Sequence, residues 1–326
     1  MIHTPVCDLL RIRHPVVLGG MATGTSVPLV AAVSNAGGLG TLGMGRTPAE
    51  QIPKDIAAIR EATKGPFGVN FLLFLTREPA LDAALDARPP VFAAAWARAD
   101  QDLRALFARA HEAGSQVMYM AGTVREARRA KAAGADVIVA QGTEGGGHVG
   151  WMASMAILPM IVDAVSPTPV LAAGGIADGR GLAAALALGA QGALLGTRFL
   201  ATKESPLHPN FKQALLDSDG HDTVLTEIPD IARATVWPGA MARSRRNAFI
   251  ERWMGREWEL RARQPEVAAA LQRALETGDA DNMSLLIGQD AGLIQDIPPA
   301  GEIVERIVVE AEALLRDRLP KLVRVG

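Results

Sequence analysis

Eight short apolar runs, most of them followed by an amphipathic segment, are the feature that most limits how this chain can fold. The runs are rich in β-branched residues and are bounded by glycines and polar residues, which is typical of buried strands. They cover residues 15–18, 39–42, 67–73, 91–96, 116–120, 136–140, 170–173 and 192–195. Strands that alternate with helices favour parallel pairing with the helices outside. The pattern therefore predicts an α/β fold, a closed (β/α)8 TIM barrel, with an open doubly wound sheet as the alternative.

The helices expected between these strands have recognisable starts. Ser26, Thr123 and Asp178 are suited to cap helices, and Pro48 is suited to a first helical turn. The expected helices cover residues 26–35, 48–63, 79–87, 100–113, 123–133, 154–165 and 178–188.

The pattern changes after residue 202, where helical segments are separated by proline-rich and polar loops. Helices are expected at 208–217, 241–260, 265–276 and 302–319. We predict three regions: a barrel over 1–205, a helical cap or substrate domain over 206–293, and a C-terminal helix over 294–326 that returns to the barrel.

The expected cap also carries large aromatic and basic side chains. Trp237, Trp253 and Trp258 are expected in its core, and Arg243 and Arg246 on a solvated helix face. The alternative is that these side chains contact substrate or a pyridine nucleotide.

Composition excludes several classes of protein. The 33 basic and 35 acidic side chains give a net charge of −2, which provides no electrostatic reason to expect nucleic acid or an anionic membrane as partner. A single cysteine excludes an internal disulfide and a cysteine-based zinc site. No apolar stretch is long enough to span a membrane, so we expect a cytoplasmic protein.

The stretch 140–150, AQGTEGGGHVG, combines flexible backbone with a titratable group. Gly145, Gly146 and Gly147 let backbone approach a ligand without an intervening Cβ, and His148 follows at once. An imidazole beside bare backbone suits a flat ligand and a proton transfer. The alternative is a mobile surface turn whose histidine has no role.

Two glycine-containing turns follow the seventh and eighth runs, where barrels of this type usually bind phosphate. The first contains Gly174, Gly175 and Ala177, and the second contains Gly196 and Thr197. Each precedes a helical stretch whose N-terminus favours negative charge.

Gly20 follows the first run, and the third run carries the polar residue Asn70. With the two phosphate turns they would surround an elongated, phosphate-bearing cofactor with the dimensions of FMN. A dinucleotide would require a Gly-x-Gly-x-x-Gly turn, which GGMATG at 19–24 does not match. A free phosphorylated metabolite in the same loops stays an alternative.

Five motifs together resemble the nitronate monooxygenase family, formerly called 2-nitropropane dioxygenases. They are GGM at 19–21, FGVN at 67–70, the stretch 141–150, AAGGIADGR at 172–180 and GTRFL at 196–200. The resemblance implies noncovalent FMN on a TIM barrel. It implies a phosphate held by Gly175, Gly196 and Thr197, and a substrate facing His148. It also implies that the ring and ribityl chain are lined by Gly20, Met21, Ala22, Asn70 and Gln141.

The resemblance implies oxidation of alkyl nitronates by dioxygen, with His148 accepting a proton or binding the nitro group. The same family includes NAD(P)H-dependent reductases of quinones or enoyl thioesters, in which His148 would supply or position a proton. The segment 92–96 departs from the glycine-containing strand end usual in nitronate monooxygenases. A flavin-binding scaffold without activity is a further alternative. The implied partners are small molecules, and a homodimer is compatible with the sequence.

Overall fold

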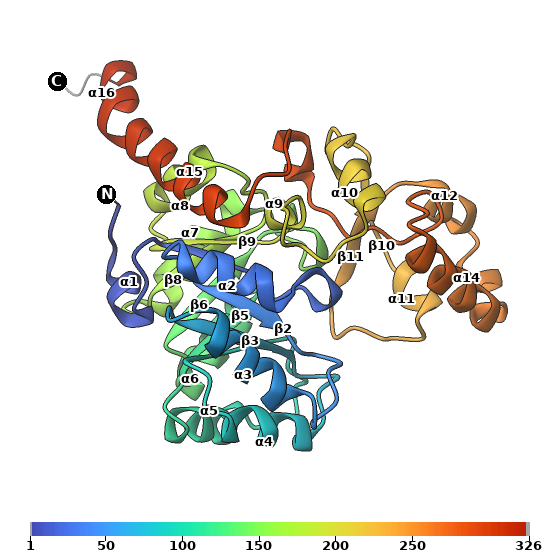
Figure 1. Ribbon diagram of the computed structural model, residues 1–326, viewed down its shortest axis with the longest axis horizontal. Coiled ribbons are helices and arrows are strands. Elements are labelled where there is room, and N and C mark those ends of the chain that lie inside the picture. The colour runs from blue at the N-terminus through green and yellow to red at the C-terminus, as the bar shows by residue number, and fades with distance from the viewer. Residues whose placement is uncertain (1, 324–326) are drawn as a thin grey trace.

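The computed structural model describes residues 2–323 and contains a barrel of eight parallel strands (Figure 1). The strands are β1 (Val16–Leu18), β2 (Gly40–Gly43), β3 (Phe67–Leu72), β4 (Val91–Ala95), β5 (Gln116–Ala121), β6 (Val137–Gln141), β8 (Val170–Ala173) and β9 (Gly192–Leu195). Their order is β1-β9-β8-β6-β5-β4-β3-β2. Leu39 closes the ring against β1: its amide donates to the Val16 carbonyl at 3.0 Å, and its carbonyl accepts from the Leu18 amide at 2.9 Å. The predicted TIM barrel is confirmed.

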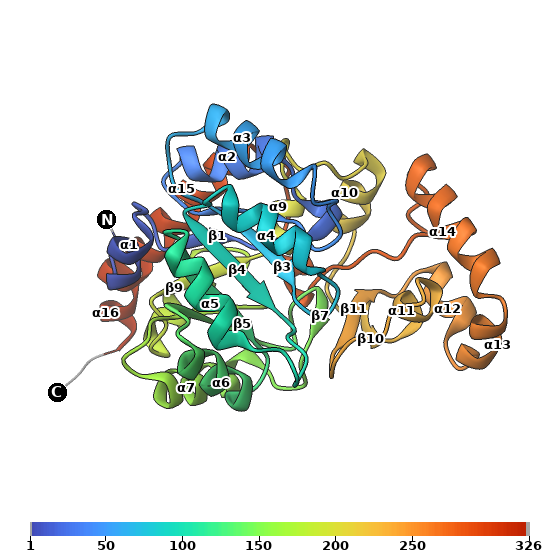
Figure 2. The same ribbon diagram turned by 90° about the horizontal axis from the view of Figure 1, so that it is seen from below.

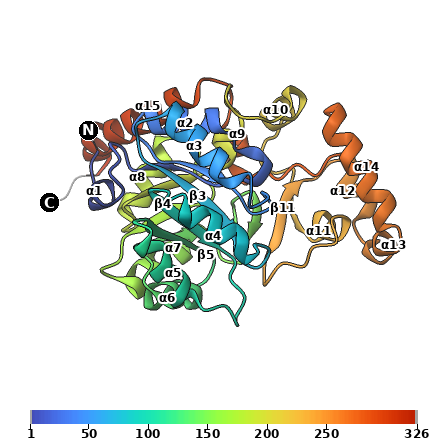
Figure 3. The same cartoon turned by 60° about the horizontal axis from the view of Figure 1, so that its bottom comes forward.

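Helices surround the strands, as Figure 3 shows. They are α2 (Val27–Asn35), α3 (Ile52–Ala62), α4 (Glu78–Asp86), α5 (Leu103–Glu112), α6 (Val124–Ala133), α7 (Ser154–Val165) and α8 (Gly179–Ala187). The side chains of Ser26, Thr123 and Asp178 accept hydrogen bonds from the first turns of α2, α6 and α8. These three predicted caps are confirmed, because each hydroxyl or carboxylate satisfies an amide that has no partner within its helix.

One end of the barrel is sealed by a helix at the start of the chain. The interior contains Val17, Leu39, Val139 and Leu171, all at most 1% exposed. The helix α1 (Pro5–Leu10) packs its buried side chains into the same cluster. Thr4, which precedes α1, donates its hydroxyl to the Gln191 carbonyl at 2.5 Å, just before β9 begins. Because α1 covers the N-terminal ends of the strands, their C-terminal ends form the mouth.

A second body of structure follows the barrel and includes strands as well as helices (Figure 2). Its elements are α10 (Pro209–Leu216), β10 (Thr223–Thr226), α11 (Ile228–Ala232), β11 (Met241–Arg245), α12 (Ala248–Trp253), α13 (Glu257–Ala262) and α14 (Gln264–Thr277). The short helix α9 (Thr197–Leu200) directly follows β9 and belongs to the barrel, because Phe199 lies in the barrel core. The predicted helix over 241–260 is wrong at its start, where β11 pairs in antiparallel fashion with both β10 and β7 (Gly147–Val149). These neighbours supply backbone hydrogen bonds on both edges of β11, and tertiary pairing of this kind overrides a local helical preference.

The chain then returns to the barrel. After η2 (Gln289–Leu293), α15 (Ala300–Ala313) packs against α8 and α2 and continues through a π-helical turn, Leu314–Arg318, into α16 (Leu319–Leu322). Its buried face consists of Ala300, Ile303, Val304, Ile307, Val308 and Ala311. This agrees with the amphipathic helix expected at 302–319. Within residues 2–323, no helix has the length and apolar character needed to cross a membrane.

Candidate active site

The loops that follow β1 and β9 meet Asn70 of β3 at the barrel mouth. A Cβ added at Gly20 would lie 2.4 Å from the Asn70 Cβ, and the Asn70 amide donates to the Gly20 carbonyl at 3.4 Å. A Cβ added at Gly196 would lie 3.3 Å from the Met21 sulfur. Ala22 begins a short 3-10 turn with a φ of +20°, against which Gly43 packs. The predicted ring-lining residues Gly20, Met21, Ala22 and Asn70 are thus in mutual proximity.

The turn after β8 requires its two glycines for different reasons. Gly174 has a φ of +95°, and a Cβ there would lie 2.8 Å from the Gly142 carbonyl oxygen. Gly175 has a φ of +72°, and a Cβ there would meet only the Glu144 side chain within 4 Å, at 3.3 Å. Gly174 is therefore needed for close packing against the loop after β6. Gly175 is needed for its left-handed backbone.

A segment that sequence reasoning missed packs against two of the predicted cofactor-binding residues, Thr197 and Gly146. The Thr197 hydroxyl accepts a hydrogen bond from the Gly288 amide at 3.0 Å. A Cβ at Gly146 would lie 2.5 Å from the Ile287 carbonyl carbon and 2.6 Å from the Gly288 nitrogen. Residues 287–288 therefore join the loops after β6 and β9. The signal was faint, since Gly288 is a single glycine far along the chain.

Gln141 ends β6 at this mouth with an unsatisfied polar atom. Its side chain is 9% exposed, and its Oε1 has no hydrogen-bond partner. A buried polar atom without a partner is costly and indicates a ligand or water that satisfies it. Gly147, in β7 (Gly147–Val149), has a φ of +75° and open space within 4 Å of an added Cβ. Both features fit a polar, flat cofactor such as FMN.

The predicted cofactor-binding residue Ala177 has a different environment. It is 6% exposed and packs in an apolar cluster with Leu200.

His148 lies in β7 and is fixed by two side chains from the second body. Its Nε2 is 2.7 Å from Asp230 Oδ1, and both side chains are 11% exposed. Its ring stacks on Trp237, with centroids 3.3 Å apart and planes inclined by 10°. Sequence reasoning missed Asp230, whose only signal is a carboxylate among apolar residues in the short helix α11.

Trp237 belongs to an aromatic cluster that links the second body to the barrel. Its ring centroid lies 4.7 Å from that of Phe74, after β3, and 5.9 Å from that of Trp96, directly after β4. Trp96 is 8% exposed and adopts a φ of +57°. A bulky residue in the left-handed region is strained, and such strain concentrates at functional sites. Trp96 is the last residue of the segment 92–96, which was singled out in the sequence.

Charged groups lie near the loops that were predicted to hold phosphate. Glu144 accepts hydrogen bonds from the Ser154 amide at 2.9 Å and from its hydroxyl at 3.0 Å. Asp290 is 6% exposed, and burial raises the pKa of its carboxyl to about 7. Arg198 opposes this shift and Glu144 adds to it. Burial also lowers the pKa of Arg198, which is held by Asp296 at 3.1 Å.

The remaining aromatic and basic residues singled out in the sequence have separate environments. Trp253 is 4% exposed in an apolar cluster, as expected, but Trp258 is 73% exposed. Arg243 lies in β11 instead of on a solvated helix face, is buried, and donates to the Thr143 carbonyl at 2.8 Å. Arg246 is exposed and pairs with Glu251.

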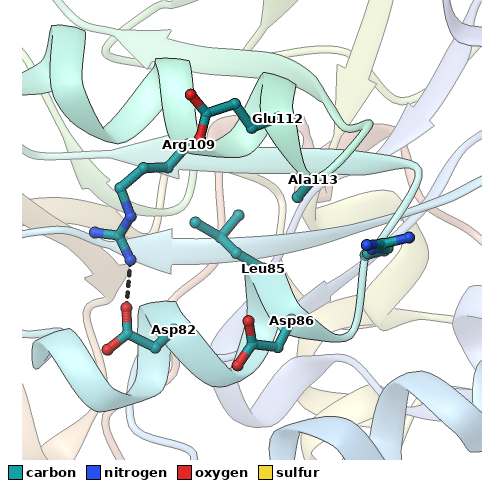
Figure 4. A pocket seen from close by; sticks show the side chains of 7 residues that line it. Asp82, Leu85, Asp86, Arg109, Glu112 and Ala113 are labelled. Atoms are coloured by element: carbon teal, nitrogen blue, oxygen red, sulfur yellow. Dashed lines mark hydrogen bonds and ion pairs between the residues drawn. The ribbon is translucent and has the colours of Figure 1, made fainter.

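A hollow lies on the outside of the barrel, between α4 and α5 (Figure 4). It has a volume of about 280 Å³ and is lined mainly by charged side chains, of which Arg109 pairs with Asp82. None of its lining residues belongs to a loop at the barrel mouth. It is therefore separate from the site around His148.

Comparison with known proteins places the chain in a family of oxidoreductases. The nitronate monooxygenase family matches over residues 3–102 and 80–310. A (3aS,4S,5R,7aS)-5-hydroxy-7a-methyl-1-oxo-octahydro-1H-indene-4-carboxyl-CoA dehydrogenase from Mycobacterium tuberculosis is 37% identical, covering 95% of this chain and 96% of the relative. A probable nitronate monooxygenase from Staphylococcus saprophyticus is 30% identical, covering 96% and 99%.

Among solved structures, FabK from Thermotoga maritima superposes with a TM-score of 0.88 at 35% identity, covering 99% of this chain and 100% of that one. Nitroalkane oxidase from Streptomyces ansochromogenes superposes with a TM-score of 0.78 at 31% identity, covering 94% and 97%. These matches span the barrel and the second body together. The chain is an enzyme of the nitronate monooxygenase family, a family of oxidoreductases.

Proposed function

We propose that this enzyme is an FMN-dependent oxidoreductase whose substrate is an acyl thioester of coenzyme A or a similar carrier. The observation that carries the proposal is His148. It lies at the barrel mouth, held by Asp230 at 2.7 Å and stacked on Trp237, where a proton-exchanging group would be needed.

FMN is supported by the unpartnered Gln141 Oε1 and by the backbone around the phosphate loops. Gly175, Gly196 and Thr197 would hold the phosphate, with Gly174 and Ala177 shaping the first of these loops. Gly20, Met21, Ala22, Asn70, Gln141, Gly146 and Gly147 would line the ring and ribityl chain. When bound, FMN would supply the exchange of electrons with the substrate.

The thioester is supported by two relatives named as CoA dehydrogenases, at 37% and 33% identity over 95% of the chain. We further propose residues 206–293 as the substrate domain, because α11 and the following loop bring Asp230 and Trp237 to His148. NADH or NADPH is the proposed second partner.

Nitronate oxidation by dioxygen is the second candidate. It is favoured by the family match and by the relatives from Staphylococcus and Streptomyces. In that reaction His148 would bind the nitro group or accept a proton. We place this candidate second for two reasons. The segment that ends at Trp96 departs from the nitronate monooxygenase pattern. These relatives are also less identical to this chain than the two CoA dehydrogenases are.

The test is an anaerobic mixing experiment with the purified, FMN-loaded protein. NADH, NADPH, propionate 3-nitronate and a saturated and an α,β-unsaturated acyl-CoA are added separately, and the flavin absorbance is followed. Bleaching by a saturated acyl-CoA, or by a nicotinamide with re-oxidation by the unsaturated acyl-CoA, supports the thioester. Reduction by nitronate alone supports the second candidate and overturns the first.

A further inference from the structure

His148 depends on the second body for its orientation, although it is carried by the loop after a barrel strand. Its hydrogen-bond partner Asp230 lies in α11. Its stacking partner Trp237 lies in the loop that follows α11. Figure 2 shows β7 at the junction of the two bodies, beside β11. The imidazole is therefore restrained in plane and in rotation by residues of the second body.

The contact with Asp230 also decides which ring nitrogen is available. An ionised carboxylate can only accept hydrogen bonds, so the bond at 2.7 Å requires a proton on Nε2. Nδ1 has no hydrogen-bond partner among residues 2–323, and the side chain retains 11% of its surface exposed. In the neutral ring, Nδ1 therefore carries the free lone pair.

We infer that Asp230 is a positioning residue that holds His148 in the Nε2–H tautomer, so that Nδ1 is the nitrogen that exchanges a proton with the substrate. The inference rests on the proposed function for the identity of the substrate. A proton taken up at Nδ1 gives an imidazolium whose Nε2–H stays on Asp230, and its release restores the neutral ring. Trp237 holds the ring plane during both steps.

The aromatic cluster explains why this arrangement depends on docking of the second body. Trp237 contacts the barrel through Phe74 and through the strained Trp96. Arg46, in the loop after β2, donates to the Thr235 hydroxyl at 3.1 Å, and the Thr235 amide donates to the Asp230 carbonyl at 3.0 Å. These contacts hold the segment 230–237 against the mouth.

The first measurement uses the intact FMN-loaded protein labelled with ¹⁵N-histidine. The chain has six histidines, and the signal of His148 is assigned by its loss in the His148→Gln variant. We expect the neutral ring to show a protonated Nε2 and a lone pair on Nδ1. The opposite tautomer overturns the inference, whatever the substrate is.

The second measurement compares carboxylate variants by kinetics with the substrate found above. The amide of Asp230→Asn can donate to Nε2 and stabilise the opposite tautomer, so we expect kcat to fall about 10²-fold, with KM and FMN binding little changed. Asp230→Glu should recover part of kcat. The matched control is Glu227→Gln. Glu227 precedes α11, and its exposed carboxylate pairs with Arg261 of α13. The ¹⁵N signals of this variant show which tautomer its His148 adopts, and wild-type kcat with the opposite tautomer overturns the inference.

These measurements separate the inference from the proposed function. If the tautomer is as expected but no thioester is turned over, the substrate assignment fails while the positioning role stands. If Asp230→Asn does not fold, the tautomer of the wild-type ring still decides the matter.

Discussion

The Thr197 hydroxyl accepts a hydrogen bond from the Gly288 amide at 3.0 Å, so a residue predicted to hold phosphate also anchors a segment 91 positions away. Both groups are buried. The hydroxyl can still donate its own proton to an anion while it accepts from this amide. The loop predicted to hold phosphate and the returning chain are thereby joined through the Thr197 hydroxyl oxygen.

Replacement of Thr197 by Val should weaken both stability and FMN binding. Valine has a similar shape but no oxygen, so the Gly288 amide would be buried without a partner, at a cost of about 1–3 kcal/mol. Urea unfolding and quenching of FMN fluorescence measure the two effects. Thr197→Ser, which keeps the oxygen, is the control and should bind FMN normally. Equal behaviour of the two variants would contradict the role of the hydroxyl.

The glycines of the site should differ in their tolerance of alanine. Gly174 combines a φ of +95° with a Cβ position 2.8 Å from the Gly142 carbonyl oxygen, whereas Gly147 has a φ of +75° and open space around an added Cβ. We expect Gly147→Ala to lower the free energy of unfolding by about 1–2 kcal/mol, because alanine is strained in a left-handed backbone. Gly174→Ala should lower it further, because its added Cβ would also clash with the Gly142 carbonyl oxygen. Thermal unfolding of the two FMN-free variants tests this order. A smaller loss for Gly174→Ala would show that the loop after β6 moves away freely.

The architecture of the barrel could be predicted from sequence because its signals are local. Buried strands and capped helices each follow from a few neighbouring residues, as with Ser26 before α2. The site itself is assembled from distant segments. Asp230 and Gly288 reach His148 and Thr197 only through tertiary packing, and nothing in their immediate neighbours indicates this.

The error at β11 has the same origin. Residues 241–245 form a strand because β7 and β10 pair with both of its edges, and β7 is formed by the glycine stretch that was expected to be a loop. In this three-stranded sheet, β10 lies about 75 positions and β11 about 95 positions after β7. Pairing over such distances leaves no periodic pattern in a short stretch of sequence.

Asp290 should make the free energy of unfolding fall as the pH rises. A carboxylate in an ion pair has the opposite effect, because its pKa is lowered in the folded chain. Burial raises the pKa of the Asp290 carboxyl from 3.8 to about 7, so the folded chain retains a proton that the unfolded chain releases. This stabilisation is fully present below about pH 4 and is lost as the pH rises towards about 7. Asp290→Asn, which stays neutral, should gain stability relative to the wild type between pH 5 and pH 8. Urea unfolding of the FMN-free proteins across that range measures the difference, and parallel curves would contradict the assignment.

Gln141 should affect stability and cofactor binding with opposite signs. Its Oε1 is buried without a partner, which is costly in the FMN-free chain and useful only if FMN satisfies it. Gln141→Leu should therefore raise the FMN-free stability by about 1 kcal/mol and weaken FMN binding by about tenfold, the equivalent of one lost hydrogen bond. Gln191 provides a matched control, because its Oε1 is also buried and unpartnered but lies before β9, at the sealed end of the barrel. Gln191→Leu should raise stability similarly and leave FMN affinity unchanged. If both variants bind FMN like the wild type, the Gln141 side chain does not contact the cofactor, and its unpaired oxygen must be satisfied by water.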